Sequence, residues 1–175
     1  MRISSASRRT DIPAFYSAWF LRRLQAGFCH WINPFGGQVY RVSLLPQDVL
    51  AIVFWTRWPA PLLPHLPSLR QAGYRFYVHV TINGYGPPLE THSPPREPAI
   101  DACRRLADAI GPDLVHWRYD PIILSPATPT QDHIRQFEAL SSRLQGSTRR
   151  CYVSFVDIYG KTVRNLRRAG IDVAR

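Results

Sequence analysis

The chain has almost no lysine. Lys161 stands alone among 22 basic residues, and the others are all arginine. Acidic residues are also scarce, 12 in all, so the formal net charge is +10 at neutral pH. Arginine favours bidentate contacts with phosphate and carboxylate groups, which makes a phosphorylated ligand or a nucleic acid one interpretation. A solvated, arginine-rich surface is the other, because net charge bears on association rather than on a specific site.

Cysteine is the second scarcity. The three thiols, Cys29, Cys103 and Cys151, are few and widely spaced. This pattern excludes a disulfide framework and the usual zinc and iron–sulfur motifs, and the six histidines show no metal-ligand spacing either. We therefore expect no metal in this chain and interpret the cysteines as buried thiols in a reducing cytoplasm.

Long apolar runs are also missing. No segment approaches the ~18 apolar residues that span a bilayer, and the amino terminus lacks the apolar stretch of a signal peptide. The sequence predicts a cytoplasmic protein without a membrane partner. With 175 residues, 45% of them hydrophobic, it is long enough for one globular domain over residues 1–175.

Five short strand-like segments alternate with helical patterns. The strand-like segments cover residues 2–5, 49–55, 76–80, 114–117 and 152–156. Such alternation predicts an α/β fold with about five mainly parallel strands joined by crossover helices. A closed barrel of this type needs roughly 200 residues or more, so the expected architecture is a partial TIM-barrel-like (β/α) array, the amino-terminal part of a longer barrel.

The connecting segments predict specific boundaries. Apolar periodicity predicts helices over residues 14–25, 99–110, 130–144 and 162–169, with Pro13 early in the first, Gly27 ending it, and Thr130 as an N-cap. The turn cluster at residues 33–37 predicts a small hairpin or a loop excursion between residues 28 and 44.

Polar side chains follow the strand-like segments. Side chains at the carboxyl ends of parallel strands converge on one mouth, where such barrels carry their chemistry. The candidates for substrate binding are Arg8, Arg9, Asp11, Thr56, Arg57, Asn83 and Arg118, and the candidates for acid–base catalysis are Asp120 and Asp157.

Structural roles compete with several of these assignments. Asp11 is placed to cap the first helix, and Arg57 either binds an anion or stacks on Trp58. Asn83 precedes Gly84, so turn chemistry alone explains it.

Arg118 and Asp120 share one face of their strand by its period of two. They form either an ordering ion pair or a carboxylate that acts beside an anion-binding group. Pro121 is expected to stop that strand, while His79 and His116 are interpreted as core residues.

Several segments resemble the bacterial family catalogued as domain of unknown function 1848. They are SASRRTDIPAFY at 5–16, NPF at 33–35, IVFWTR at 52–57, WRYDPI at 117–122 and SFVDIY at 154–159. The resemblance runs in order over nearly the whole chain.

The resemblance implies longer relatives with a cysteine cluster near the carboxyl terminus. That cluster is like the one with which radical S-adenosylmethionine enzymes hold a 4Fe-4S cluster. No such set occurs in these 175 residues, so the resemblance predicts the amino-terminal half of a radical-SAM-like enzyme that supplies substrate contacts. Two alternatives remain: a cluster-independent enzyme acting on a phosphorylated or sugar-like substrate, and a basic nucleic-acid-binding module. An exposed strand at residues 152–156 would also favour self-association.

Overall fold

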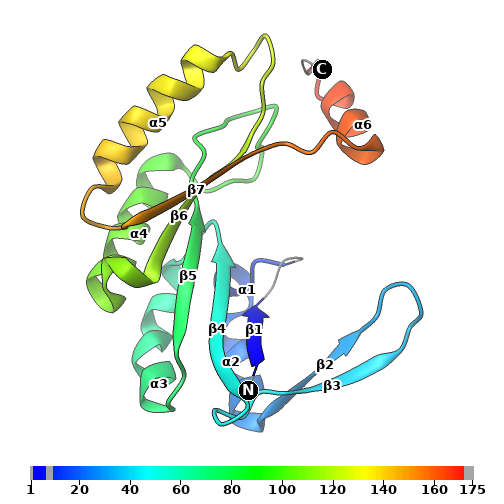
Figure 1. Ribbon diagram of the computed structural model, residues 1–175, viewed down its shortest axis with the longest axis vertical. Coiled ribbons are helices and arrows are strands. Elements are labelled where there is room, and N and C mark those ends of the chain that lie inside the picture. The colour runs from blue at the N-terminus through cyan, green and yellow to red at the C-terminus, as the bar shows by residue number, and fades with distance from the viewer. Residues whose placement is uncertain (1, 7–9, 172–175) are drawn as a thin grey trace. The chain divides into compact units, whose positions relative to one another are not determined.

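A computed structural model (Figure 1) describes residues 2–6 and 10–171. The chain divides into two compact units, Met1–His79 and Val80–Arg175, and each is described by itself. Its main sheet has five strands in the order β1-β4-β5-β6-β7, and β5 (Phe76–Thr81) crosses the boundary between the units. The predicted α/β fold with a parallel sheet flanked by helices is confirmed, whereas the division into domains stays a prediction.

The first unit pairs β1 (Arg2–Ala6) in parallel with β4 (Val49–Thr56). Five of the eight residues of β4 are buried, as its continuous apolar sequence predicts. The short helix α1 (Ile12–Phe15) contacts β4. A 3-10 helix (Ala60–His65) leads directly into α3 (Leu66–Gln71).

The predicted single helix over residues 14–25 is wrong. The structure has two helices, α1 and α2 (Ser17–Ala26), because Tyr16 leaves helical geometry with φ −135°. The Ser17 hydroxyl donates to the Pro13 carbonyl, which the break would otherwise leave unpaired. Gly27 ends α2 in the left-handed conformation with φ 76°, as expected for a C-cap glycine.

Residues 28–43 form a separate antiparallel hairpin of β2 (Phe28–Ile32) and β3 (Val39–Ser43). This confirms the hairpin interpretation of the turn cluster. The hairpin extends away from β1 and β4 in Figure 1.

The second unit pairs β6 (Val115–Ile122) in parallel with β7 (Arg150–Phe155). Its helices are α4 (Arg96–Ile110), α5 (Thr130–Leu144) and α6 (Gly160–Arg168), with a 3-10 turn at Pro112–Leu114. β7 ends the strand order, and Val153 and Phe155 on it are exposed. Self-association through this edge stays a prediction.

Two local predictions fail in the second unit. Thr130 is the first residue of α5 rather than its N-cap, a position held by Pro129. Pro121 does not stop β6, which continues through it to Ile122. A proline lacks only its own N–H, so a strand tolerates it where the ladder is already irregular, as it is between Tyr119 and Ile122.

Candidate functional site

β6 has two faces of opposite character. Val115, Trp117 and Tyr119 are at most 2% exposed. Trp117 and Tyr119 contact Phe137 of α5, with ring centroids 4.9 and 5.4 Å away respectively. The alternate residues, His116 and Arg118, are half-buried on the other side of the strand.

β7 extends this second face. Tyr152 is the register partner of Arg118, and the Ser154 hydroxyl donates to Asp120 over 3.3 Å. We call this surface the open face. It consists of His116, Arg118, Asp120, Arg150, Tyr152 and Ser154. The ordinary choice for a parallel sheet is an aliphatic residue, and the open face has none.

An ion pair lies at the centre of the open face. Arg118 Nε donates to Asp120 Oδ1 over 2.9 Å, and Arg118 Nη2 donates to Asp120 Oδ2. Side-chain exposure is only 21% for Arg118 and 12% for Asp120. The guanidinium also lies 5.8 Å from the Tyr152 ring centroid. This fork geometry fixes the orientation of both charged groups.

A second cationic contact lies beside His116. Arg150 Nη1 donates to the Tyr152 hydroxyl over 3.3 Å, and the Tyr152 ring lies 5.7 Å from the imidazole of His116. Burial and the charge of Arg150 lower the pKa of His116 below its ordinary value of 6.5. His116 is therefore neutral at physiological pH, and it lies on the open face rather than in the core.

Asn83 holds the end of β6 in place. Its Nδ2 donates to the Asp120 carbonyl over 2.9 Å, and its Oδ1 accepts from the Asp120 N–H over 3.1 Å. Asn83 is 2% exposed. Both polar groups of the side chain are thus engaged with backbone 37 residues away, so Asn83 positions Asp120, and turn chemistry alone does not explain it.

Tyr85 adds a second clamp that the sequence did not reveal. Its hydroxyl donates to the Pro121 carbonyl over 3.0 Å and accepts from the Ile123 N–H over 2.8 Å. Burial raises the pKa of Tyr85 to about 12. The clamp spans the irregular part of β6. Its signal in the sequence was only an aromatic residue in a glycine-rich loop.

In the first unit, Asp11 joins two elements. Its Oδ1 accepts from the Ala14 N–H over 2.9 Å and caps α1, and its Oδ2 accepts from the Arg57 N–H over 2.7 Å. Thr56 is buried, and its Oγ1 accepts from the Trp58 N–H. Through these bonds to backbone N–H groups, Asp11 and Thr56 stabilise the backbone at the carboxyl end of β4.

The remaining candidates lie apart from this network. Arg8 and Arg9 fall outside the described residues. Asp157 is exposed and follows the carboxyl end of β7, three residues beyond Ser154. Among the described residues, no hydrogen bond or ion pair joins Asp157 to Asp120. A shared catalytic role for these two carboxylates stays a prediction.

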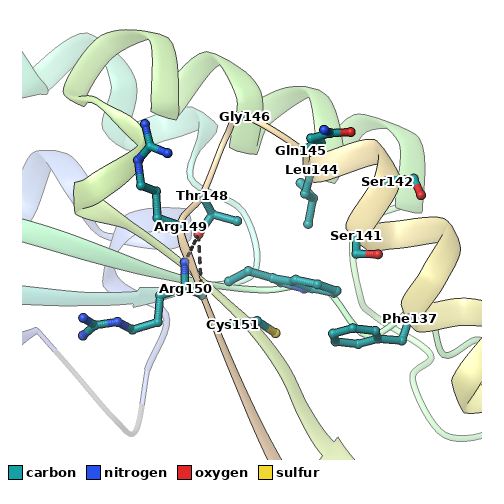
Figure 2. A pocket seen from close by; sticks show the side chains of 11 residues that line it. Phe137, Ser141, Ser142, Leu144, Gln145, Gly146, Thr148, Arg149, Arg150 and Cys151 are labelled. Atoms are coloured by element: carbon teal, nitrogen blue, oxygen red, sulfur yellow. Dashed lines mark hydrogen bonds between the residues drawn. The ribbon is translucent and has the colours of Figure 1, made fainter.

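The opposite face of β7 borders two hollows beside α5. One, of about 460 Å³, is lined by residues that include Trp117, Phe137, Thr148 and Cys151 (Figure 2). The other, of about 420 Å³, is lined mainly by apolar side chains such as Ile134 and Phe155. Neither is lined by Arg118 or Asp120, but Arg150 of the open face also lines the first hollow, so the second hollow alone is separate from the polar network among the described residues.

The thiols do not fit an iron–sulfur cluster. Cys29 lies in β2, Cys103 is buried in α4 and Cys151 lies in β7. Burial raises the pKa of Cys103 to about 12 and that of Cys151 to about 11, which disfavours the thiolates that bind metals. The described part of the chain holds no group of three or more His, Cys, Asp or Glu residues that suits a metal ion. No described helix is long and apolar enough to cross a membrane.

Comparison with known proteins gives one family. Residues 3–175 match the family described as "Domain of unknown function (DUF1848)". No curated protein and no solved structure matches the chain.

Proposed function

This chain belongs to the DUF1848 family, and we propose that its open face binds a small anionic substrate, phosphorylated or sugar-like. The observation that carries the proposal is the residue choice on that face. All six side chains are polar or charged, on two neighbouring parallel strands, where folding alone favours aliphatic residues. Two arginines against one aspartate make the face cationic, which favours an anion.

The roles follow from the contacts. Arg118 and Arg150 are the anion-binding groups, and Tyr152 and Ser154 supply hydroxyls for polar substituents. Asp120 is the carboxylate suited to proton transfer, and its pairing with Arg118 orients it toward the same ligand. Asn83 is a positioning residue, because it contacts only the backbone of Asp120.

We further propose that this domain contributes substrate contacts, and no cluster ligands, to a radical-SAM-like enzyme. The resemblance to longer relatives supports the class of enzyme, and the placement of the three thiols supports the division of labour. Anaerobic reconstitution of this chain should leave iron and sulfide far below stoichiometric amounts. Stoichiometric incorporation with a charge-transfer absorbance would contradict this division.

Thermal unfolding with inorganic pyrophosphate tests the anion site directly. Pyrophosphate should raise the melting temperature more than chloride does at matched ionic strength, because a ligand that binds only the folded state stabilises it. Arg150→Gln should remove most of that increase. Arg149→Gln is the matched control: the neighbouring arginine pairs with Asp113 over 3.2 Å, and its side chain leaves the backbone in a different direction (Figure 2).

Two results would contradict the proposal. One is an equal loss of stabilisation in the Arg149 and Arg150 variants, which would indicate diffuse charge. The other is the absence of any stabilisation beyond that given by chloride.

A further inference from the structure

The β2–β3 hairpin is the most exposed apolar element of the first unit. Large apolar side chains lie open to solvent on both strands and at the tip: Trp31 at 47%, Ile32 at 59%, Phe35 at 95%, Val39 at 57% and Tyr40 at 41%. The hairpin forms its own two-stranded sheet. An isolated hairpin is at best marginally stable in water, so this much exposed aromatic surface points to a partner.

Two of these rings form a platform. Trp31 and Tyr40 are register partners across the hairpin, with ring centroids 5.2 Å apart and planes tilted by 34°. The Tyr40 hydroxyl donates to Gln38 over 2.6 Å, which holds that ring. Phe35 lies at the tip and is almost fully exposed. Exposed rings of this kind stack on any flat π surface.

The charge around the platform has one sign. Residues 12–47 contain Arg22, Arg23 and Arg41 and no aspartate or glutamate. Arg41 lies 4.3 Å from the Phe28 ring centroid and is the register partner of His30, so it lies on the face of the hairpin opposite to Trp31 and Tyr40. In the described residues, the buried Nε of Arg23 meets no hydrogen-bond partner. With nine arginines and two aspartates in residues 1–79, this unit carries most of the net positive charge.

We propose that the hairpin binds single-stranded nucleic acid. Unpaired bases offer the flat surfaces that Trp31 and Tyr40 can stack against. A strand that wraps around the two-stranded hairpin brings its phosphates to Arg41 on the other face. A duplex hides its base faces, so single strands are the better match. A bilayer is the weaker match, because the polar turn residues Asn33 and Gln38 would have to enter it ahead of the platform.

The experiment measures fluorescence anisotropy of a fluorescein-labelled oligothymidylate with the full 175-residue chain at low and moderate salt. Trp31→Ala and Tyr40→Ala should each weaken binding roughly ten-fold through lost stacking. Arg41→Gln should reduce the salt dependence by about one phosphate contact. Trp19→Ala is the matched control, because Trp19 is 42% exposed on α2, outside the hairpin, and it should bind like the wild type.

Trp31→Phe keeps an aromatic face and should retain most of the affinity. Circular dichroism melts of each variant show whether a loss of binding is merely a loss of folding. The same labelled strand annealed to its complement should bind more weakly.

Three results would each overturn the proposal: no binding at low salt, equal affinity of Trp31→Ala and the wild type for the oligonucleotide, or equal affinity for the single strand and the duplex. A fourth is the combination in which the alanine variants lose binding because they unfold and Trp31→Phe also fails to bind. Binding to phosphatidylserine vesicles that requires Trp31 and Tyr40, without oligonucleotide binding, would assign the hairpin to a membrane surface instead.

Discussion

The two faces of β6 differ in the burial and in the polarity of their side chains. Trp117 and Tyr119 pack under α5 and are almost fully buried, while Arg118 and Asp120, their immediate neighbours, lie half-buried in a polar network. Packing against a helix explains the first pair. Nothing in the hydrophobic core requires the second pair, because a largely buried ion pair often gives no more net stability than apolar residues of similar size would. The comparison separates residues that serve folding from residues available for a ligand.

The largest expected effect on the free energy of unfolding is on the face of β6 that packs against α5, here called the helix side. Trp117→Ala should lower the free energy of unfolding by about 3–5 kcal/mol, because it removes a buried ring and the hydrogen bond from Trp117 Nε1 to the Ile82 carbonyl. Urea denaturation measures it, with Trp117→Phe as the milder comparison. If Trp117→Ala costs no more than a surface substitution, the helix side is not the stabilising face.

The second largest effect on the free energy of unfolding is expected at Asn83, whose side chain holds the Asp120 backbone. Asn83→Ala removes both hydrogen bonds to the Asp120 backbone and leaves buried polar groups unpaired, so we expect a loss of about 1–3 kcal/mol in the free energy of unfolding. Asn83→Asp keeps the acceptor for the Asp120 N–H but buries a carboxylate whose other oxygen faces the Asp120 carbonyl, so its loss should be at least as large. Equal stability of the wild type and both variants would show that the clamp does not hold β6.

The open face should contribute less to stability than either of these. A double-mutant cycle with Arg118→Met and Asp120→Asn should give a coupling energy of about 1 kcal/mol from urea denaturation. Stabilisation by pyrophosphate should fall sharply in Arg118→Met, whereas Asp120→Asn should keep or increase it, because that variant removes a negative charge beside the anion site. A coupling as large as the loss in Trp117→Ala would make the pair a folding element, which removes the distinction between the faces.

The smallest effect is a pH dependence. The pKa of His116 is lower in the folded state than its ordinary value of 6.5, so folding favours the neutral imidazole. Its contribution to stability is complete above 6.5 and declines as the pH falls below that value. Urea denaturation at pH 7.5 and 5.5 should show a smaller acid-side loss in His116→Asn than in the wild type. His30→Asn, on the exposed hairpin, should leave the loss unchanged.

Local pattern identified much of this arrangement. The continuous apolar run of β4 indicated a parallel strand, and the period of two placed Arg118 and Asp120 on one face. Ser154 and Tyr85 were missed because their bonds to Asp120, Pro121 and Ile123 span more than 30 residues, a separation at which sequence spacing carries no signal.

Boundaries were also harder to predict. The break at Tyr16 accompanies a local bond from the Ser17 hydroxyl to the Pro13 carbonyl. The passage of β6 through Pro121 coincides with the bonds of Tyr85, which lies more than 30 residues away. Neither is contained in helix or strand propensity. The chemical role of the open face stays a proposal for the same reason, since no pattern in the strands names the ligand.

The most direct test of the central claim is a nuclear magnetic resonance titration of the labelled chain with inorganic pyrophosphate. The account predicts that the largest amide shift changes fall on the open face, at His116, Arg118 and Ser154, and that Arg150→Gln abolishes them. Shift changes confined to α6 and its arginines, or to the apolar hollow around Ile134, would contradict it.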